Sequence, residues 1–448
     1  MSSQTCSGVT SGGSYDVAVV GAGVIGMATA WALARRGFKV AVIDKNEGPG
    51  RGTSFANGAQ LSYSYTDALA SPSLLKKLPG LIFGEDPSLQ INKSLDPAFL
   101  LWGLQFLRNC SSAHFTANTV EGLKLGLESR LAMQQLLSRH RLDFGHEVSG
   151  KMHLFYDGQA FKAACEVMQL KQAHGAQQQA LSAHEAAQVE PALASVQGLA
   201  GVIYSPEDEV GDPHAFCLAM LELLQQQYSV DAHFGFDLAK LHAQGGSARL
   251  SDVKGNVIEA RHVAICMGIG APSFLRKIGI RVPVWPMKGY SFTAPPTQNT
   301  PRVSITDTAR KIVFCRLNEQ VRVAGLAELG NWNPAPDPAR LRSLAVLAEE
   351  SLPQAADYKA QASGWAGLRP MSPSSLPIIS QPRKEILLNV GHGMLGWTFA
   401  LGAAERAASL LNPSSMKETS NDIFPAAAEQ SEARRQSLVP VGAAAKGQ

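Results

Sequence analysis

The sequence predicts an α/β fold of more than one domain, and three observations support this prediction. The chain has 448 residues, of which 45% are hydrophobic, enough for two or three buried cores and too many for an ordinary single one. An apolar strand, a glycine turn, a helical run and a second strand follow one another in residues 16–43. Further strand-like runs occur at 230–236, 246–253, 262–267, 284–293, 311–314 and 320–324, so the later part of the chain is expected to be rich in sheet.

The glycine turn at the start of the fold predicts a dinucleotide site. It has the pattern G-x-G-x-x-G, it follows a strand and it opens a helix that Gly37 ends. The first glycine allows a tight turn, the second lets the backbone approach a pyrophosphate, and the third lets helix and strand pack closely. The residues of this turn are Gly21, Ala22, Gly23, Val24, Ile25 and Gly26.

Asp44 and the loop after it narrow the choice of dinucleotide. Asp44 ends the second strand, where a carboxylate can accept hydrogen bonds from ribose hydroxyls, so FAD or NAD is favoured over NADP. The following loop, Thr53 to Gln60, is small and polar. Such a loop can hydrogen-bond a pyrophosphate or a flavin ring edge, and it can equally be a surface turn.

Several helices are indicated by their caps and periodicity. Residues 114–142 carry leucines four apart on one stripe. Ser182 with Glu185 has the pattern of a capping box, and Asp212-Pro213 has that of an N-cap and first turn for a helix reaching residue 228. Another helix is expected after Asp337-Pro338, and a last one over residues 398–411.

Two segments near the C-terminus contain candidate binding residues. Trp365 to Pro373 is interpreted as a tight, proline-limited loop, in which Arg369 either grips a carboxylate or forms a structural ion pair. Asn389 to Thr398 joins a strand to a helix and has three glycines in six residues, which favours close backbone approach to a negatively charged group. His392 in this turn is a catalytic base or, with better odds, a packing residue.

Charge and cysteine usage exclude several classes. The 40 basic and 37 acidic residues give +3, too small a bias for a dedicated nucleic-acid binder. The six cysteines are scattered without a C-x-x-C pair, which argues against a disulfide scaffold or a metal site and favours a cytoplasmic location. Residues 17–34 are uncharged over the length of a membrane span, but they contain three glycines and begin as a strand. We therefore expect no span, while peripheral attachment at the inner face of a membrane stays open.

Taken together, the ordered motifs resemble the D-amino-acid dehydrogenase branch of the flavin-dependent D-amino-acid oxidase and glycine oxidase superfamily. The resemblance runs from about residue 15 to residue 411. The motifs that carry it are VVGAGVIG, TSFANGAQ, LRNCSSAHF, EDEVGDP, PMKGYS, VRVAGLAE, GWAGLRPMSP and NVGHGMLGWT.

The resemblance implies a Rossmann-type FAD-binding domain interleaved in sequence with an antiparallel-sheet substrate domain that caps the flavin. The FAD-binding domain would comprise residues 15–95, 195–280 and 365–412, and the substrate domain residues 96–194 and 281–364. Residues 1–14 and 413–448 are polar and small-residue-rich and are expected to be a disordered leader and tail.

The resemblance also implies site residues. The substrate site would use Arg369 for the carboxylate, with Tyr290 as a second donor and Lys288 as a positive charge near the reduced ring. FAD would be bound by the glycine turn, by Asp44, Lys45, Ser54, Asn57, Gly58, Leu238 and Gly268, and by Gly393, Met394, Leu395, Gly396, Trp397 and Thr398. No metal is expected.

The implied activity is oxidative deamination of a D-amino acid to a 2-oxo acid and ammonia, by hydride transfer to flavin N5. The electrons would pass to a quinone or another carrier. Two alternatives remain open at this point: an oxygen-using oxidase of the glycine, sarcosine or D-proline type, and a flavin-binding subunit without turnover.

Overall fold

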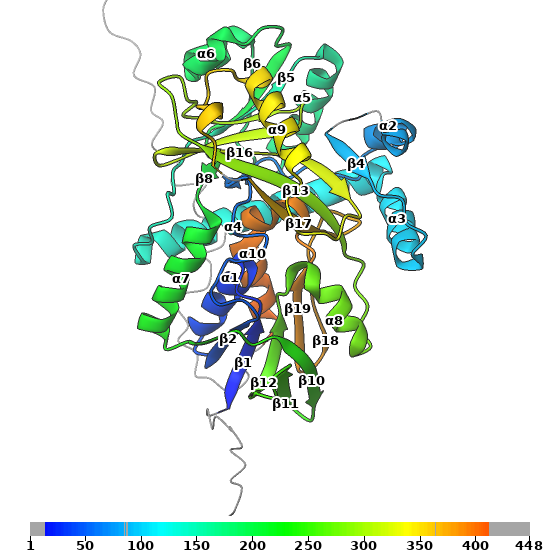
Figure 1. Cartoon of the computed structure of the whole chain (residues 1–448), viewed down its shortest axis with the longest axis vertical. Coiled ribbons are helices and arrows are strands. Elements are labelled where there is room, and N and C mark those ends of the chain that lie inside the picture. The colour runs from blue at the N-terminus through cyan, green and yellow to red at the C-terminus, as the bar shows by residue number, and fades with distance from the viewer. Residues whose placement is uncertain (1–13, 85, 87, 363, 412–448) are drawn as a thin grey trace, which may run out of the picture. The chain divides into compact units, whose positions relative to one another are not determined.

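The computed structural model describes residues 14–84, 86, 88–362 and 364–411. Their strands form two large sheets and a small two-stranded ladder, and helices cover the sheets (Figure 1). The predicted tail and all but the last residue of the predicted leader lie outside the described residues. No helix of the described part is both long and apolar enough to cross a membrane.

The first sheet contains the predicted strand–turn–helix–strand unit. Its order is β10-β11-β12-β1-β2-β9, with β19 added to β12 and β18 added to β19. The central strand β1 runs parallel to both β2 and β12. The strands are β1 (Tyr15–Val20), β2 (Val40–Asp44), β9 (Asp231–Phe234), β10 (Leu238–Gln244), β11 (Ser247–Asp252), β12 (Val257–Ile265), β18 (Ile378–Arg383) and β19 (Ile386–Val390).

Helices close both faces of this sheet. Helix α1 (Val24–Ala34) packs against α7 (Pro213–Tyr228) and α10 (Gly396–Ser409), and α8 (Ala271–Lys277) joins the core on the other face. Parallel strands buried on both sides explain the continuous apolar runs in the sequence. Gly37 has φ +85° just after α1, the left-handed conformation of a helix-ending glycine.

The second sheet has the order β17-β13-β16-β15-β14-β5-β7-β6, with β4 paired to β16. Most neighbours are antiparallel, as the family resemblance implied for the substrate domain. The strands are β4 (Leu89–Ile91), β5 (Lys151–Phe155), β6 (Gln179–Leu181), β7 (Gly201–Ser205), β13 (Trp285–Ala294), β14 (Ser304–Asp307), β15 (Ile312–Leu317), β16 (Gln320–Leu329) and β17 (Trp365–Met371).

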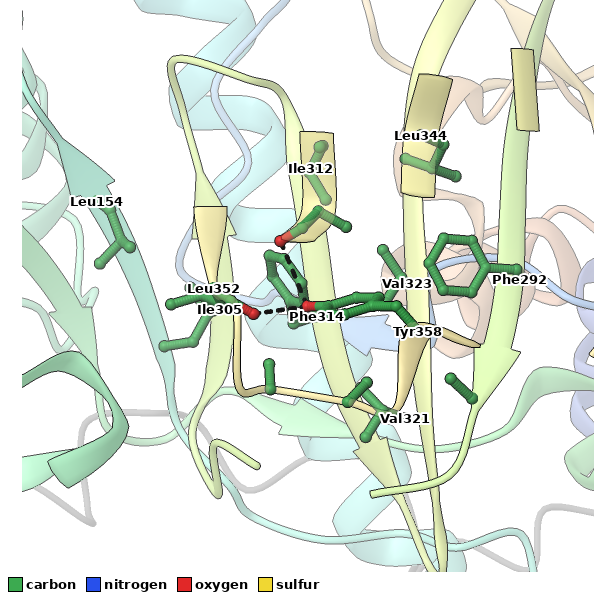
Figure 2. Close-up of a cluster of buried hydrophobic side chains, with 14 of the residues drawn as sticks. Leu154, Phe292, Ile305, Ile312, Phe314, Val321, Val323, Leu344, Leu352 and Tyr358 are labelled. Atoms are coloured by element: carbon green, nitrogen blue, oxygen red, sulfur yellow. Dashed lines mark hydrogen bonds between the residues drawn. The ribbon is translucent and has the colours of Figure 1, made fainter. Parts of the chain in front are cut away.

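One face of the second sheet packs against α9 (Pro338–Ser351) and holds a large apolar core. Figure 2 shows Phe292, Phe314 and Val323 of neighbouring strands beneath Leu344 of the helix. The hydroxyl of Tyr358 donates to the carbonyl oxygen of Leu352 at 2.7 Å within this core. The opposite face is therefore the one available for a site.

The remaining elements include a two-stranded ladder of β3 (Gln60–Leu61) and β8 (Glu209–Val210). The other helices are α2 (Pro72–Phe83), α3 (Pro97–Asn109), α4 (Ser112–Arg139), α5 (Gly158–Gln172) and α6 (Ala183–Val189), with 3-10 turns η1 (Pro191–Ser195), η2 (Gly268–Gly270), η3 (Tyr358–Ala360) and η4 (Gly393–Leu395). The capping box at Ser182 and the N-cap at Asp212 are confirmed.

The loop predicted from Trp365 to Pro373 is wrong. Trp365 to Met371 is strand β17, which is hydrogen-bonded along β13. Alternate residues of this segment can face opposite sides of the sheet. Pro370 is tolerated because β17 is an edge strand. Strands β4, β7 and β17 belong to the second sheet, although their residues fall in ranges assigned to the FAD-binding domain. The boundaries themselves stay a prediction.

Candidate active site

The glycine turn between β1 and α1 has no space for side chains at two of its three glycines. A Cβ on Gly26 would lie 1.6 Å from the carbonyl oxygen of Gly21, and a Cβ on Gly21, which has φ +108°, would lie 2.4 Å from that of Cys266. Gly23 is the N-cap of α1 and has no side chain of its own to cap the helix. The turn therefore lets a phosphate approach the backbone at the start of α1.

Two side chains border this turn. One carboxylate oxygen of Asp44 accepts the N–H of Ala22 at 2.7 Å, and the other accepts that of Asn46 at 2.8 Å, so the predicted ribose acid lies beside the turn. The hydroxyl of Ser54 accepts the N–H of Val24 at 3.1 Å. Lys45 is exposed on the other side of Asp44.

A second helix start, that of α10, has the same character. Gly391 and Gly393 have φ +78° and +58°, and neither a side-chain cap nor an acid occupies the first turn of α10. His392 between them is 3% exposed, its Nε2 has no hydrogen-bond partner, and burial lowers its pKa to about 3. His392 is therefore neutral at physiological pH, with one polar atom left for a ligand or water.

The other predicted residues of this region are distributed around α10 and the first sheet. Trp397 donates from Nε1 to the carbonyl of Gly211 at 3.0 Å, while Met394 is about half exposed. Leu238 opens β10 and is buried in the core of the first sheet. Gly268 follows β12 with φ +52° and open space around its Cα. Leu395 and Gly396 lie at the end of η4 and the start of α10.

The segment from Thr53 to Ser62 crosses the face of the second sheet opposite α9. It follows the strand order of the sheet, because successive residues bond to β17, β13, β16, β14 and β5. These hydrogen bonds are Thr53 Oγ1 to Leu368 O (2.9 Å), Ser291 Oγ to Ala56 O (2.5 Å), Arg322 Nη1 to Asn57 O (3.1 Å), Gln60 Nε2 to Ser304 Oγ (2.7 Å) and Lys151 Nζ to Ser62 Oγ (2.6 Å). Gly58 lies over β15 and β16, where a Cβ would meet Val313 at 3.0 Å.

Arg369 lies on this same face, over a strip of bare backbone. Arg369 pairs with Met287 of β13 in the strand register. Its guanidinium covers Gly289, where a Cβ would lie 2.1 Å from Nη2. The neighbouring Gly367 is covered in the same way by the indole of Trp365, 2.1 Å from a hypothetical Cβ. Gly289 and Gly367 are paired across the two strands, so guanidinium and indole lie side by side.

Arg369 has no carboxylate partner in the described part of the chain. Its Nη1 donates to the carbonyl of Leu326 at 3.3 Å, and burial lowers its pKa to about 10. Leu326 has φ +56° at a β-bulge, where two residues of β16 face Gly289 alone. Bulges and strained residues of this kind occur at functional sites. A charged, partly buried guanidinium without an ion-pair partner is suited to bind an anionic ligand.

Tyr290 and Lys288 are not brought together with Arg369. Adjacent residues of a strand point to opposite faces, and the hydroxyl of Tyr290 donates to Glu328 at 2.9 Å within the core beneath α9. The pKa of Tyr290 is raised by burial and by this carboxylate. Lys288 donates from Nζ to the carbonyl of Ala335 at 2.5 Å. The structure therefore gives no support to either as a neighbour of the substrate.

Sequence reasoning missed Trp365 and the bulge at Leu326. The alternation W-x-G-x-R was a usable signal for the first, because it puts Trp365, Gly367 and Arg369 on one face of a strand. The bulge had no such signal, since it arises from a register shift between two strands that lie far apart in the sequence.

A Rossmann-type sheet whose first turn is this glycine turn defines a dinucleotide-binding fold, and the second sheet adds a guanidinium that has no carboxylate partner among the described residues. Residues 16–410 match the family model of FAD dependent oxidoreductases, called DAO. The chain belongs to this family. FAD is accordingly its cofactor. The glycine turn fits such a group, as do the start of α10, which has no side-chain cap, and Nε2 of His392, which has no partner among the described residues.

Curated relatives agree with this assignment, and a solved structure shares the fold. The chain is 37% identical over 401 residues to a D-amino acid dehydrogenase of Paramagnetospirillum magneticum, covering 88% of this chain and 94% of the relative. It is 36% identical to D-amino acid dehydrogenase 2 of Pseudomonas aeruginosa, over 86% and 92% of the two chains. Its fold resembles glycine oxidase from Geobacillus kaustophilus, with TM-score 0.70, 19% identity and coverage of 88% and 94%.

Proposed function

We propose that this chain is a D-amino-acid dehydrogenase that uses FAD to oxidise a D-amino acid. The product would be a 2-imino acid, which water converts to a 2-oxo acid and ammonia. The observation that carries the proposal is Arg369, a guanidinium without a carboxylate partner on the sheet face opposite α9. Relatives named D-amino acid dehydrogenase at 33–37% identity support the substrate class.

The residues that would hold FAD come from three places. The glycine turn with Asp44 and Lys45 would bind the ADP half, with Leu238 at the adenine. Ser54, Asn57, Gly58 and Gly268 would lie near the pyrophosphate or the ring. The start of α10 would bind the pyrimidine end, because its uncapped N–H groups favour negative charge; its residues are Gly393, Met394, Leu395, Gly396, Trp397 and Thr398.

When bound, FAD supplies the oxidising power by accepting the hydrogen and electron pair of the substrate α-carbon as a hydride. Arg369 would bind the substrate carboxylate through two N–H groups, which fixes the position of the α-carbon. The substrate's uncharged amino group provides the electron pair of the new C=N bond. Since β13 turns Lys288 and Tyr290 to the other face, we assign neither to proton transfer, and the ammonium proton leaves to water.

Trp365 would form the wall against which the substrate side chain rests. Its indole lies beside the guanidinium on the same face, so a bound amino acid with its carboxylate on Arg369 has this aromatic surface within reach. We therefore propose Trp365 as a contact for apolar side chains of the substrate.

For the electron acceptor we propose a quinone or another carrier rather than oxygen, with peripheral attachment at the inner face of a membrane. The name of the relatives, dehydrogenases rather than oxidases, supports the acceptor. A quinone dissolved in the bilayer is reached most directly from the membrane surface, which supports the location.

The test is anaerobic reduction of the bound flavin by a panel of D- and L-amino acids. Bleaching by D-amino acids and not by their enantiomers is expected. Arg369→Ala should raise KM about ten- to hundredfold, while Arg261→Ala, which removes an exposed arginine from β12, should leave KM unchanged. Peroxide formed in an amount equal to the substrate consumed, in aerated buffer without added acceptor, would identify an oxidase instead. Full flavin content without bleaching by either enantiomer would favour a flavin-binding subunit without turnover.

A further inference from the structure

Exposed leucines are concentrated on and around α3. Of the sixteen large hydrophobic side chains exposed among the described residues, six lie between residues 75 and 107. We call these six the leucine surface: Leu75 on α2, Leu95 before α3, and Leu100, Leu101, Leu104 and Leu107 on α3. Helices α2 and α3 lie together at one side of the second sheet (Figure 1). Clustered exposed apolar side chains of this kind mark a surface that contacts an apolar partner.

Helix α3 carries apolar side chains on two opposite sides, although only one of these sides is covered. Trp102 and Phe106 face inward, where they join a core with Trp285, Met287 and Met371. The indole of Trp102 donates to the carbonyl of Met371 at 3.0 Å. Leu100, Leu104 and Leu107 occupy the other side, at the spacing of one helical stripe. A helix with apolar side chains on opposite sides is stabilised when both sides are taken out of water.

Most of the charges on the helices of the leucine surface are basic. Neither α2 nor α3 contains an acidic residue within its bounds. Lys76 and Lys77 on α2 and Arg108 in the last turn of α3 are exposed. Of the nearby acids, Asp96 caps the N-terminus of α3 and Asp86 pairs with Lys311. Apolar side chains flanked by lysine and arginine match the interface of a bilayer that contains anionic lipids.

From these observations we infer that α2 and α3 are the element by which this protein docks on an anionic membrane surface, with the leucines of α3 inserted among the lipid chains. With 13 residues, α3 is about 20 Å long, too short to span a bilayer and suited to lie in its interface. The inference rests on the proposed function, because docking would bring the enzyme to an electron acceptor that is dissolved in the lipid.

The place of α3 in the fold gives this docking a consequence for electron transfer. Met287, on the inner side of α3, is the residue that pairs with Arg369 across the two strands. The layer that contacts lipid is therefore separated from the substrate arginine by a single apolar cluster. An apolar acceptor leaving the bilayer beside α3 would meet a hydrophobic rather than a charged surface.

The test is flotation of the purified holoprotein with phosphatidylcholine vesicles, with and without phosphatidylglycerol. The wild-type protein should float with anionic vesicles, and high salt should weaken this binding in part, because it screens only the basic residues. The double variant Leu101→Gln/Leu104→Gln should lower the ratio of bound to free protein by about tenfold per leucine. The matched control is Leu218→Gln/Val346→Gln, which removes two exposed apolar side chains from α7 and α9 and should float as wild type.

Two outcomes would overturn the inference. One is a wild-type protein that stays in solution with both kinds of vesicle. The other is a wild-type dimer that Leu101→Gln/Leu104→Gln converts to a monomer without vesicle binding, since the surface would then contact a second copy. Activity separates this inference from the proposed function: a soluble dye should accept electrons equally from both double variants and the wild type. Vesicle binding without flavin reduction by any amino acid would leave the docking surface standing and refute the proposed function.

Discussion

Replacing Gly289 by alanine should displace the guanidinium of Arg369 without removing it. The new methyl group would lie 2.1 Å from Nη2 and 2.2 Å from Cζ of Arg369, well inside van der Waals contact, so the side chain has to leave the surface of β13. If the guanidinium binds the substrate carboxylate, this movement removes a charged hydrogen bond of about 1.5–3 kcal/mol. The expected result is a KM for the D-amino acid raised by about ten- to hundredfold.

The assay is steady-state oxidation with a soluble dye acceptor, combined with the flavin content of the purified variant. Flavin content should stay at the wild-type level, because Gly289 lies on the second sheet and away from the glycine turn. Gly103→Ala on α3 is the matched control, since a Cβ there meets nothing within 4 Å, and it should retain the wild-type KM. A Gly289→Ala enzyme with an unchanged KM would refute the placement of the carboxylate on Arg369.

Four further outcomes are expected. Gly26→Ala should yield protein depleted of flavin, measured by the visible absorbance per chain, because the methyl group would lie 1.6 Å from a backbone oxygen; full flavin content would contradict the assigned turn. Trp365→Ala should raise KM more for D-amino acids with large apolar side chains than for D-alanine, and an equal change across the series would argue against a side-chain wall. Propionate, a carboxylate without an amino group, should perturb the flavin spectrum at neutral pH and lose this effect as the pH rises through about 10, since the Arg369 guanidinium is charged below that pKa; binding unchanged well above it would exclude this partner. Tyr358→Phe removes the 2.7 Å hydrogen bond to Leu352 and should lower the free energy of unfolding by about 1 kcal/mol in denaturant melts, with activity unchanged in the native state; an unaltered midpoint would show that the bond contributes nothing net.

The sequence was most informative where local physics determines structure. The glycine turn, the N-cap at Asp212 and the capping box at Ser182 each depend on residues a few positions apart, so their patterns could be interpreted without the fold. The family resemblance supplied the two-sheet organisation and FAD, and the family match confirms FAD.

Pairing between distant strands limited the prediction of the site. Two prolines led to the interpretation of Trp365 to Pro373 as a loop, but an edge position in the sheet tolerates Pro370. The faces of Lys288 and Tyr290 depend on the register of β13 against β16 and β17, which no local pattern contains. The exposure of the leucines on α3 could not be predicted either, because a leucine-rich helix has the sequence pattern of a helix buried in a core.

The path of residues 53–62 links the two layers of the fold. Residues 53–62 are hydrogen-bonded to five strands of the second sheet. Near both ends they are also hydrogen-bonded to helices that cover the first sheet, through Ser54 with Val24 and Ser62 with Thr398. A hinge motion that parted the two layers would break this whole series of bonds together. We therefore expect the spacing between the glycine turn and Arg369 to stay fixed during turnover, with substrate entering past peripheral loops or helices.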